Sequence, residues 1–256
     1  MLDKALEPIN TGLGKVAAAK TTFELTTALG AVTSDSGRAI RTLKAADTPA
    51  EVVATRTDLV AALDTLASEA SAISADIWKK KLCAVGAGQA RLGGGQGMPG
   101  LSAALNTLTA AGYRTVLTVP ELPKPQPQPR TLDNGTMIRE GGKNGRGKVK
   151  INNDGAADAV FTLAMNGKSV ASVYAAKGQE TGIEGIEDGS YDFYLTTGVD
   201  WDSEARQFTQ DCSSVKYQEK YAFESAGTIW RIDLASGDKK DLAHVDGQTV
   251  NSAPQP

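Results

Sequence analysis

A run of prolines near the middle of the chain restricts the fold more than any other feature of this sequence. Residues 120–129 have proline at positions 120, 123, 125, 127 and 129. Each proline fixes its own φ angle and removes a backbone N–H donor, which favours extended polyproline II over a helix or a central strand. We therefore predict a semi-rigid linker over residues 120–130 that separates two domains, a number that fits a length of 256 residues.

Before the linker, apolar residues recur at the spacing of an α-helix. One stripe steps by three or four residues through Leu59, Leu63, Leu66, Ala70, Ile73 and Ile77. An earlier stripe comprises Leu6, Ile9, Leu13, Val16 and Phe23. A single amphipathic helix cannot bury its own stripe, so residues 1–119 are predicted to form an antiparallel helical bundle.

Several residues indicate where these helices begin and end. Thr48 is predicted to cap the helix of the longer stripe, with Pro49 in its first turn and Glu51 completing a capping box. Gly112 is predicted to stop a last helix over residues 99–111 in the left-handed conformation. Pro8 and its neighbouring glycines predict a kink or a late start for the first helix.

After the linker the hydrophobic period changes to two, which is typical of strands. Segments rich in β-branched and aromatic residues lie at 160–165, 168–175, 190–197 and 228–235. Asn166 and Gly167 between the first two segments indicate a two-residue hairpin turn. We expect an antiparallel β-sandwich of immunoglobulin-like size over residues 131–236, followed by a flexible tail at 237–256. The fold class is therefore α+β with two domains.

Composition argues against several classes of function. The formal net charge is 27 − 30 = −3, which does not suit a dedicated nucleic-acid-binding protein. No apolar run approaches the roughly 20 residues of a membrane span. With one histidine and two cysteines, most zinc frameworks are excluded, and we predict no metal site and no cofactor. The N-terminus has no signal-peptide pattern, so the chain is either cytoplasmic or a mature form whose leader was removed.

Three carboxylates gather around one tryptophan at Asp200, Trp201, Asp202 and Glu204. Alternating carboxylates are possible Ca²⁺ ligands, but the spacing lacks the glycine and the final glutamate of an EF-hand loop. Paired carboxylates also serve glycoside hydrolysis, at a separation that a sequence does not reveal. We expect a structural turn instead, with Trp201 packed on the sandwich and the carboxylates mostly solvated.

Other candidate sites have weaker patterns. His244 lies alone in the predicted tail, so we predict no catalytic residue of the histidine-dependent type. The glycine-rich residues 93–100 lack the Gly-Lys-Ser/Thr ending of a phosphate loop and are predicted to be a flexible interhelix loop. The basic, glycine-rich residues 141–148 have no interleaved aromatic residues for base stacking and are predicted to be a solvated hairpin tip.

The second half of the chain carries a set of short motifs that together resemble a known group of sequences. They include DNGTMIR at 133–139, GRGK at 145–148, IEDGSY at 186–191 and TGVDWD at 197–202. This half resembles the β-rich region of uncharacterised secreted and lipid-anchored bacterial proteins, in which that region follows an Ala-rich helical segment. The resemblance implies an extracellular or cell-envelope location and brings no known catalytic residue.

Together these observations predict a non-enzymatic secreted or envelope protein that binds or presents a ligand through its β-sandwich. Its partner would be a cell-surface component or another protein, and nothing in the sequence indicates an oligomeric state. Two alternatives stay open. One is a hydrolase of cell-wall glycan or peptide that uses Asp200, Asp202 and Glu204. The other is a structural subunit whose helical stripes complete a larger assembly.

The two cysteines lead to a testable prediction. Cys83 and Cys212 lie one in each predicted domain, and an extracellular location permits disulfides. We expect a Cys83–Cys212 disulfide that ties the domains together. Thiol titration of the unreduced, denatured protein should then find no reactive thiol, whereas two reactive thiols per chain would contradict the disulfide.

Overall fold

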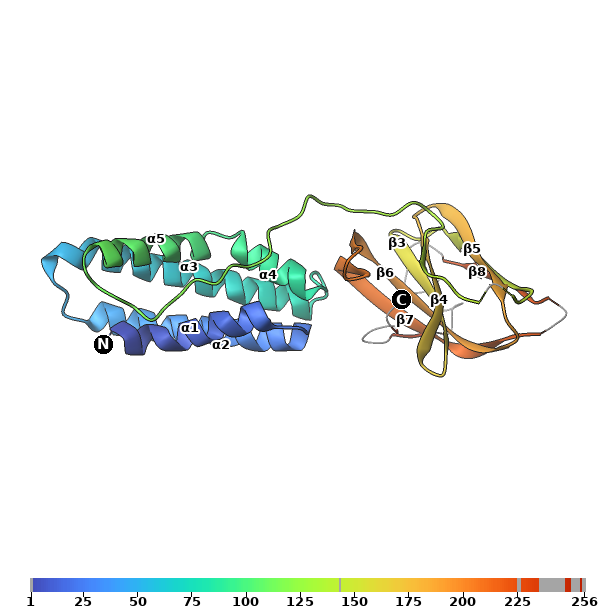
Figure 1. The fold of residues 1–256 in the computed structure, drawn as a ribbon, viewed down its shortest axis with the longest axis horizontal. Helices are drawn as coiled ribbons and strands as arrows, with labels where there is room; N and C mark the ends of the chain where they lie inside the picture. The colour runs from blue at the N-terminus through green and yellow to red at the C-terminus, as the bar shows by residue number, and fades with distance from the viewer. Residues whose placement is uncertain (1, 143, 225–226, 235–246, 250–253, 255–256) are drawn as a thin grey trace. The chain divides into compact units, whose positions relative to one another are not determined.

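The computed structural model describes residues 2–142, 144–224, 227–234, 247–249 and 254. The chain divides into two compact units, Met1–Pro127 and Gln128–Pro256, and the division falls inside the proline-rich segment. The first unit is helical and the second is mostly antiparallel β-sheet, so the protein is an α+β chain (Figure 1). No helix of the described residues is long and apolar enough to cross a membrane.

The helical unit is a bundle of packed helices with an aliphatic core. Its elements are α1 (Leu2–Ala18), α2 (Thr22–Ala45), the 3₁₀ turn η1 (Ala50–Val52), α3 (Val53–Trp78), α4 (Val85–Gly93) and α5 (Gly97–Ala110). α2 packs against α1 and α3, and α3 also packs against α5. All six residues of the predicted stripe on α3 are buried in this core, which confirms the helical spacing.

Helix boundaries differ from several predictions. The capping box belongs to α2, where the Thr21 hydroxyl accepts the Glu24 N–H and the Glu24 carboxylate accepts the Thr21 N–H. Thr48 does not cap α3, because its hydroxyl donates to the Ala46 carbonyl oxygen and η1 intervenes. Phe23 is exposed rather than buried. It does not continue the apolar stripe of α1, because α1 ends at Ala18 and Phe23 belongs to a separate helix, α2.

Of the other boundary predictions, one is confirmed and two are wrong. α1 begins at Leu2 and runs through Pro8, so of the two predicted alternatives, a kink or a late start, the late start is wrong. Gly112 has a φ of +85° after α5, as predicted for a left-handed stop. Most of the predicted loop at 93–100 is helical, because α4 and α5 leave only residues 94–96 between them. The Glu69 carboxylate of α3 fixes this junction by accepting the N–H groups of Gln96 and Gly97.

The proline-rich segment is partly attached to the helical unit. Leu117 and Leu122 are buried in the helical core, and the Thr118 N–H donates to Asn10 Oδ1 at 2.9 Å. Gly93 makes room for this segment, because a Cβ there would lie 3.0 Å from the Leu122 side chain. The chain is therefore held as far as Leu122 before it passes into the remaining prolines.

The β unit contains two sheets. The strands are β1 (Met137–Arg139), β2 (Gly147–Asn153), β3 (Asp158–Met165), β4 (Lys168–Ala175), β5 (Gln179–Ile186), β6 (Gly189–Asp202), β7 (Gln207–Phe223), β8 (Ile229–Asp233) and β9 (Gly247–Thr249). Six strands form one sheet in the order β1-β4-β3-β6-β7-β9, and three form another in the order β5-β2-β8. Within the described residues, all strand pairs are antiparallel except β2 with β8.

The four predicted strands are all present as β3, β4, β6 and β8, and Asn166 and Gly167 turn β3 into β4 with φ angles of 52° and 75°. Within the predicted tail, Gly247–Thr249 form β9 and pair with β7. His244 and the rest of the tail, apart from Pro254, lie outside the described residues, as does Ala235 of the last predicted strand.

Apolar side chains fill the β unit on both faces of the larger sheet. One cluster joins Phe161 and Phe193 of the larger sheet to Ile151 and Ile183 of the smaller sheet. Phe193 lies edge-on to Phe161, with ring centroids 5.0 Å apart, and such pairs add to the area term. The opposite face carries a smaller cluster of Val160, Tyr174, Trp201 and Phe208.

Because each unit has its own apolar cluster, we expect each to fold alone. Inserting a protease recognition site between Pro125 and Gln126 and cutting it should yield two stable fragments after reduction with dithiothreitol. Each purified fragment should melt cooperatively, the first with a helical circular dichroism spectrum and the second with a β spectrum. Loss of cooperative melting in either fragment would show that the two units depend on each other.

Candidate functional site

The predicted acidic turn contains a buried ion pair. Asp200 lies in β6 with a φ of 61°, and only 2% of its surface is exposed. Its Oδ1 accepts the backbone N–H and the Nε–H of Arg130, each at 2.9 Å. Its Oδ2 accepts Arg130 Nη2 and the Thr209 hydroxyl, both at 2.6 Å. The expectation of solvated carboxylates is therefore wrong for Asp200, since its partner lies 70 residues away in sequence.

These contacts keep Asp200 ionised. Burial alone would raise the pKa of the Asp200 carboxyl, because a low dielectric disfavours its charged form. The hydrogen bonds from Arg130 and Thr209, together with the charge of Arg130, outweigh burial and hold this pKa below its ordinary value. An acid with a lowered pKa that is fully engaged in hydrogen bonds is poorly suited to donate a proton in hydrolysis.

The neighbours of Asp200 have structural contacts too. Trp201 is 3% exposed, and its ring lies edge-on to those of Phe208 and Tyr174, with centroids 5.1 and 5.9 Å away. Trp201 is thus packed against neighbouring aromatic rings of the larger sheet. Asp202 Oδ1 accepts the backbone N–H groups of Glu204 and Ala205, each at 3.0 Å, which closes the turn into β7.

Glu204 is exposed, so the candidate residues do not converge on one open site. Among the residues that the structure describes, no three His, Cys, Asp or Glu side chains are grouped so that they could hold a metal ion. The described loop thus offers neither the converging oxygens of a calcium site nor a free acid and base. Residues 200–202 end β6 and residues 203–206 form the turn into β7, so this acidic segment has a structural role.

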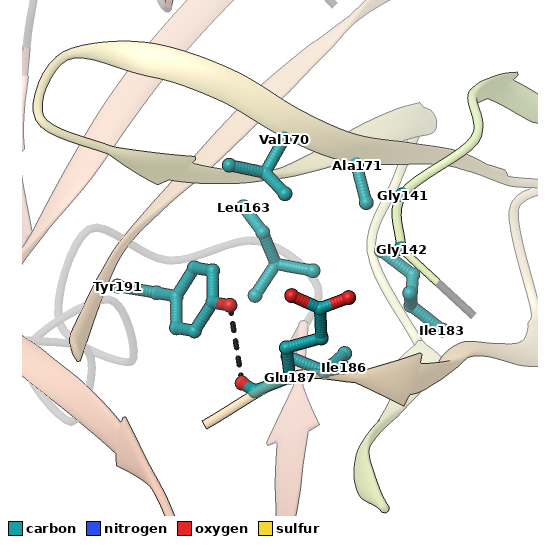
Figure 2. A pocket seen from close by; sticks show the side chains of 9 residues that line it. All are labelled: Gly141, Gly142, Leu163, Val170, Ala171, Ile183, Ile186, Glu187 and Tyr191. Carbon is teal, nitrogen blue, oxygen red and sulfur yellow. Dashed lines mark hydrogen bonds between the residues drawn. The ribbon is translucent and has the colours of Figure 1, made fainter. Parts of the chain in front are cut away.

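A small recess lies beside the turn between β5 and β6 (Figure 2). Leu163, Ile183 and Ile186 form its apolar wall, and the Glu187 carboxylate points into it. The Tyr191 hydroxyl donates to the Glu187 carbonyl oxygen at 3.1 Å, and burial raises the pKa of Tyr191. Its volume of about 40 Å³ is room for a few water molecules and too small for a metabolite.

A wider groove follows the outer face of the three-stranded sheet. Side chains of β2 alternate across this sheet, so that Val149 and Ile151 are buried while Lys150 is exposed. Lys150 is in register with Arg231 of β8 on one side and with Gly182 of β5 on the other. The polar residues that line the groove on this face are Lys148, Lys150, Asn152, Glu180, Glu184 and Arg231.

Gly182 keeps the floor of this groove open. A Cβ at this position would lie 2.3 Å from the Val149 carbonyl oxygen, so a side chain does not fit there without moving the backbone. Lys150 consequently has no side chain beside it on β5 at its own register. The groove thus has an empty strip directly beside Lys150, and Arg231 lies on the other side of this lysine.

Charges along the groove are arranged in rows. Lys148 is paired with Glu184 of β5, with 3.0 Å between Nζ and Oε1. In the next row Lys150 and Arg231 lie side by side on parallel strands, which places their side chains on the same face. Glu180 and Asp233 occupy the row of Asn152 beyond them. The middle row therefore concentrates two positive charges between rows that carry carboxylates.

From the sequence, the basic residues that lead into β2 were predicted to lie on a solvated hairpin tip. The alternation of lysine and aliphatic residues from Lys148 to Ile151 could have indicated a strand with Lys148 and Lys150 on one face, but no strand was predicted there. Nothing local indicated that β8 would join it in parallel and bring Arg231 beside Lys150. No protein-family model matches the chain, and no curated protein is similar enough to it to count as a match.

The ion pair predicts an acid-dependent loss of stability. Asp200→Asn removes the charge that offsets Arg130, and we expect the free energy of unfolding at pH 7 to fall by about 2–4 kcal/mol. Because the pKa of Asp200 is lowered in the folded state, its contribution is full above about pH 4, the ordinary range of an aspartate. It is lost as the pH falls through the lower folded pKa.

Urea unfolding of wild type and variants at pH 7 and pH 3 measures this. Glu204→Gln is the control, since it makes the corresponding carboxylate-to-amide change at an exposed residue of the same segment and should cost under about 1 kcal/mol. Equal losses in the two variants would contradict a special role for Asp200.

Proposed function

We propose that this chain is a non-enzymatic binding protein, secreted or held in a bacterial cell envelope, whose β unit binds or presents an anionic ligand. The observation that carries the proposal is the groove on β5-β2-β8, where Lys150 lies between Arg231 and the empty strip at Gly182. The location rests on the resemblance of residues 133–202 to secreted and lipid-anchored bacterial sequences.

In this proposal the β unit is a sandwich of immunoglobulin-like size. Its support is the apolar cluster shared by residues of both sheets, such as Phe161 of β3 and Ile151 of β2. Packing the smaller sheet through its inner face leaves its outer face to water and to ligands. A rigid sheet is a suitable platform, because strand pairing fixes the spacing of Lys150 and Arg231 without help from loops.

The chemistry of the groove favours an acidic glycan. Arg231 offers a planar fork of donors for a carboxylate or sulfate, and Lys150 offers a compact positive charge beside it. Asn152 and the carboxylates of Glu180 and Glu184 line the same groove and can exchange hydrogen bonds with sugar hydroxyls. The apolar residues that line the groove, Val149 and Ile151, are themselves buried, which disfavours a hydrophobic ligand.

The hydrolase alternative has less support. It needs Asp200, Asp202 and Glu204 to act on one substrate, yet Arg130 and Thr209 engage both carboxylate oxygens of Asp200. Asp202 uses one oxygen to close its own turn. We therefore assign these residues to stability and the groove to binding.

Binding is tested with a heparin-derived hexasaccharide as the anionic probe and maltohexaose as the neutral probe. In titrations followed by amide NMR, the anionic probe should shift resonances of β2, β5 and β8, and the neutral probe should not. The double variant Lys150→Ser/Arg231→Ser should weaken binding at least about tenfold, equivalent to about 1.4 kcal/mol.

The matched control is Lys168→Ser/Lys220→Ser, which removes two exposed cations from the other sheet. It should leave the affinity unchanged. Equal weakening by both double variants would reduce the interaction to general charge attraction, and absence of shifts in β2, β5 and β8 would overturn the proposed site.

A further inference from the structure

Four elements meet at one end of the helical unit: the end of α1, the start of α2, the end of α3 and α4 (Figure 1). The Gln89 side chain of α4 donates to the Val16 carbonyl oxygen of α1 at 2.8 Å. A Cβ on Gly88 would lie 2.7 Å from Leu25 in the first turn of α2 and 3.6 Å from Ile77 in the last turn of α3. We refer to this part, comprising residues 15–24 and 76–91, as the α4 end.

The α4 end carries the two most exposed aromatic rings of the helical unit. That unit contains only three aromatic residues, Phe23, Trp78 and Tyr113. Phe23 and Trp78 are each 73% exposed, whereas Tyr113 packs against the aliphatic core. The buried core of the bundle thus contains no large aromatic ring, and the two exposed rings, Phe23 and Trp78, lie at the same end of the unit.

Positive charge is concentrated at the same place. The cations of residues 15–24 and 76–91 are Lys15, Lys20, Lys79, Lys80, Lys81 and Arg91. The carboxylates there are Glu24, which caps α2, and Asp76, which is paired with Arg91 at 2.6 Å. The α4 end therefore has a formal charge of 6 − 2 = +4 within a chain whose formal net charge is −3.

The three successive lysines sit on an ordered turn. The Lys79 N–H donates to the Ala75 carbonyl oxygen at 3.0 Å and the Lys81 N–H to that of Asp76 at 2.9 Å. No salt bridge within the described part of the chain involves Lys79, Lys80 or Lys81. Some cations at a helix C-terminus complement its dipole, but that effect does not explain exposed rings beside them.

We propose that the α4 end docks on the surface of an anionic phospholipid bilayer. Trp78 and Phe23 enter the headgroup region, where aromatic rings are favoured, and the lysines lie against the lipid phosphates. Neither the inserted aromatic rings nor the basic cluster would attach the protein firmly alone, whereas the two together do. A second copy of this chain is a poorer occupant, since pairing two such ends would bring two +4 surfaces together.

The test uses the full chain and extruded vesicles. Sedimentation should show binding to vesicles of 70% phosphatidylcholine and 30% phosphatidylglycerol, and at least tenfold weaker binding to pure phosphatidylcholine. Trp78→Ala/Phe23→Ala and Lys79→Ser/Lys80→Ser/Lys81→Ser should each weaken binding to the anionic vesicles at least tenfold. Tryptophan emission should shift to the blue on binding, and Trp78→Phe should abolish the shift.

Lys4→Ser/Arg41→Ser/Lys44→Ser is the matched control, because it removes three exposed cations of the helical unit outside the α4 end. This variant should bind as wild type does. The proposal is overturned if the wild-type chain ignores anionic vesicles, if the control triple loses as much binding as the Lys79–Lys81 triple, or if the blue shift survives Trp78→Phe. It is equally overturned if sedimentation without lipid finds a dimer that Trp78→Ala/Phe23→Ala dissociates, which would identify a second copy as the occupant.

Discussion

The ion pair between Arg130 and Asp200 determines where the chain enters the β unit. A buried carboxylate is tolerated only when hydrogen bonds replace its lost water, and Asp200 obtains them from Arg130 and Thr209. Arg130 also accepts, through its carbonyl oxygen, the N–H of Trp201 at 2.8 Å. The end of the proline-rich segment is thereby fixed to β6 through both the backbone and the side chain of Arg130.

Packing on one face of the larger sheet depends on this attachment. Trp201 follows Asp200 directly, so holding the backbone there aims its ring at Tyr174 and Phe208. Leu132, two residues after Arg130, packs against the same cluster. A charged contact thus positions an apolar one, which explains why Asp200 and Trp201 are buried although the acidic residues that follow them are not.

Local patterns were sufficient for elements whose signal lies within one segment. The stripe on α3 and the Asn166-Gly167 turn are of this kind, since helical spacing and positive φ preferences act over a few residues. Contacts between distant segments were not predictable in this way. Arg130 with Asp200, and Lys150 with Arg231, each join residues that only the folded topology brings together. The groove therefore could not have been identified before the parallel pairing of β2 and β8 was known.

The two proposed surfaces share one physical property, which is that folding does not need their charges. Lys150 and Arg231 point away from the core beneath them, and Lys79–Lys81 lie beyond the last buried turn of α3. Exposed like charges placed side by side contribute repulsion rather than stability. Removing them should therefore leave the fold intact, in contrast to Asp200, whose charge the fold requires. This separation makes loss of binding at either surface interpretable as loss of function rather than loss of structure.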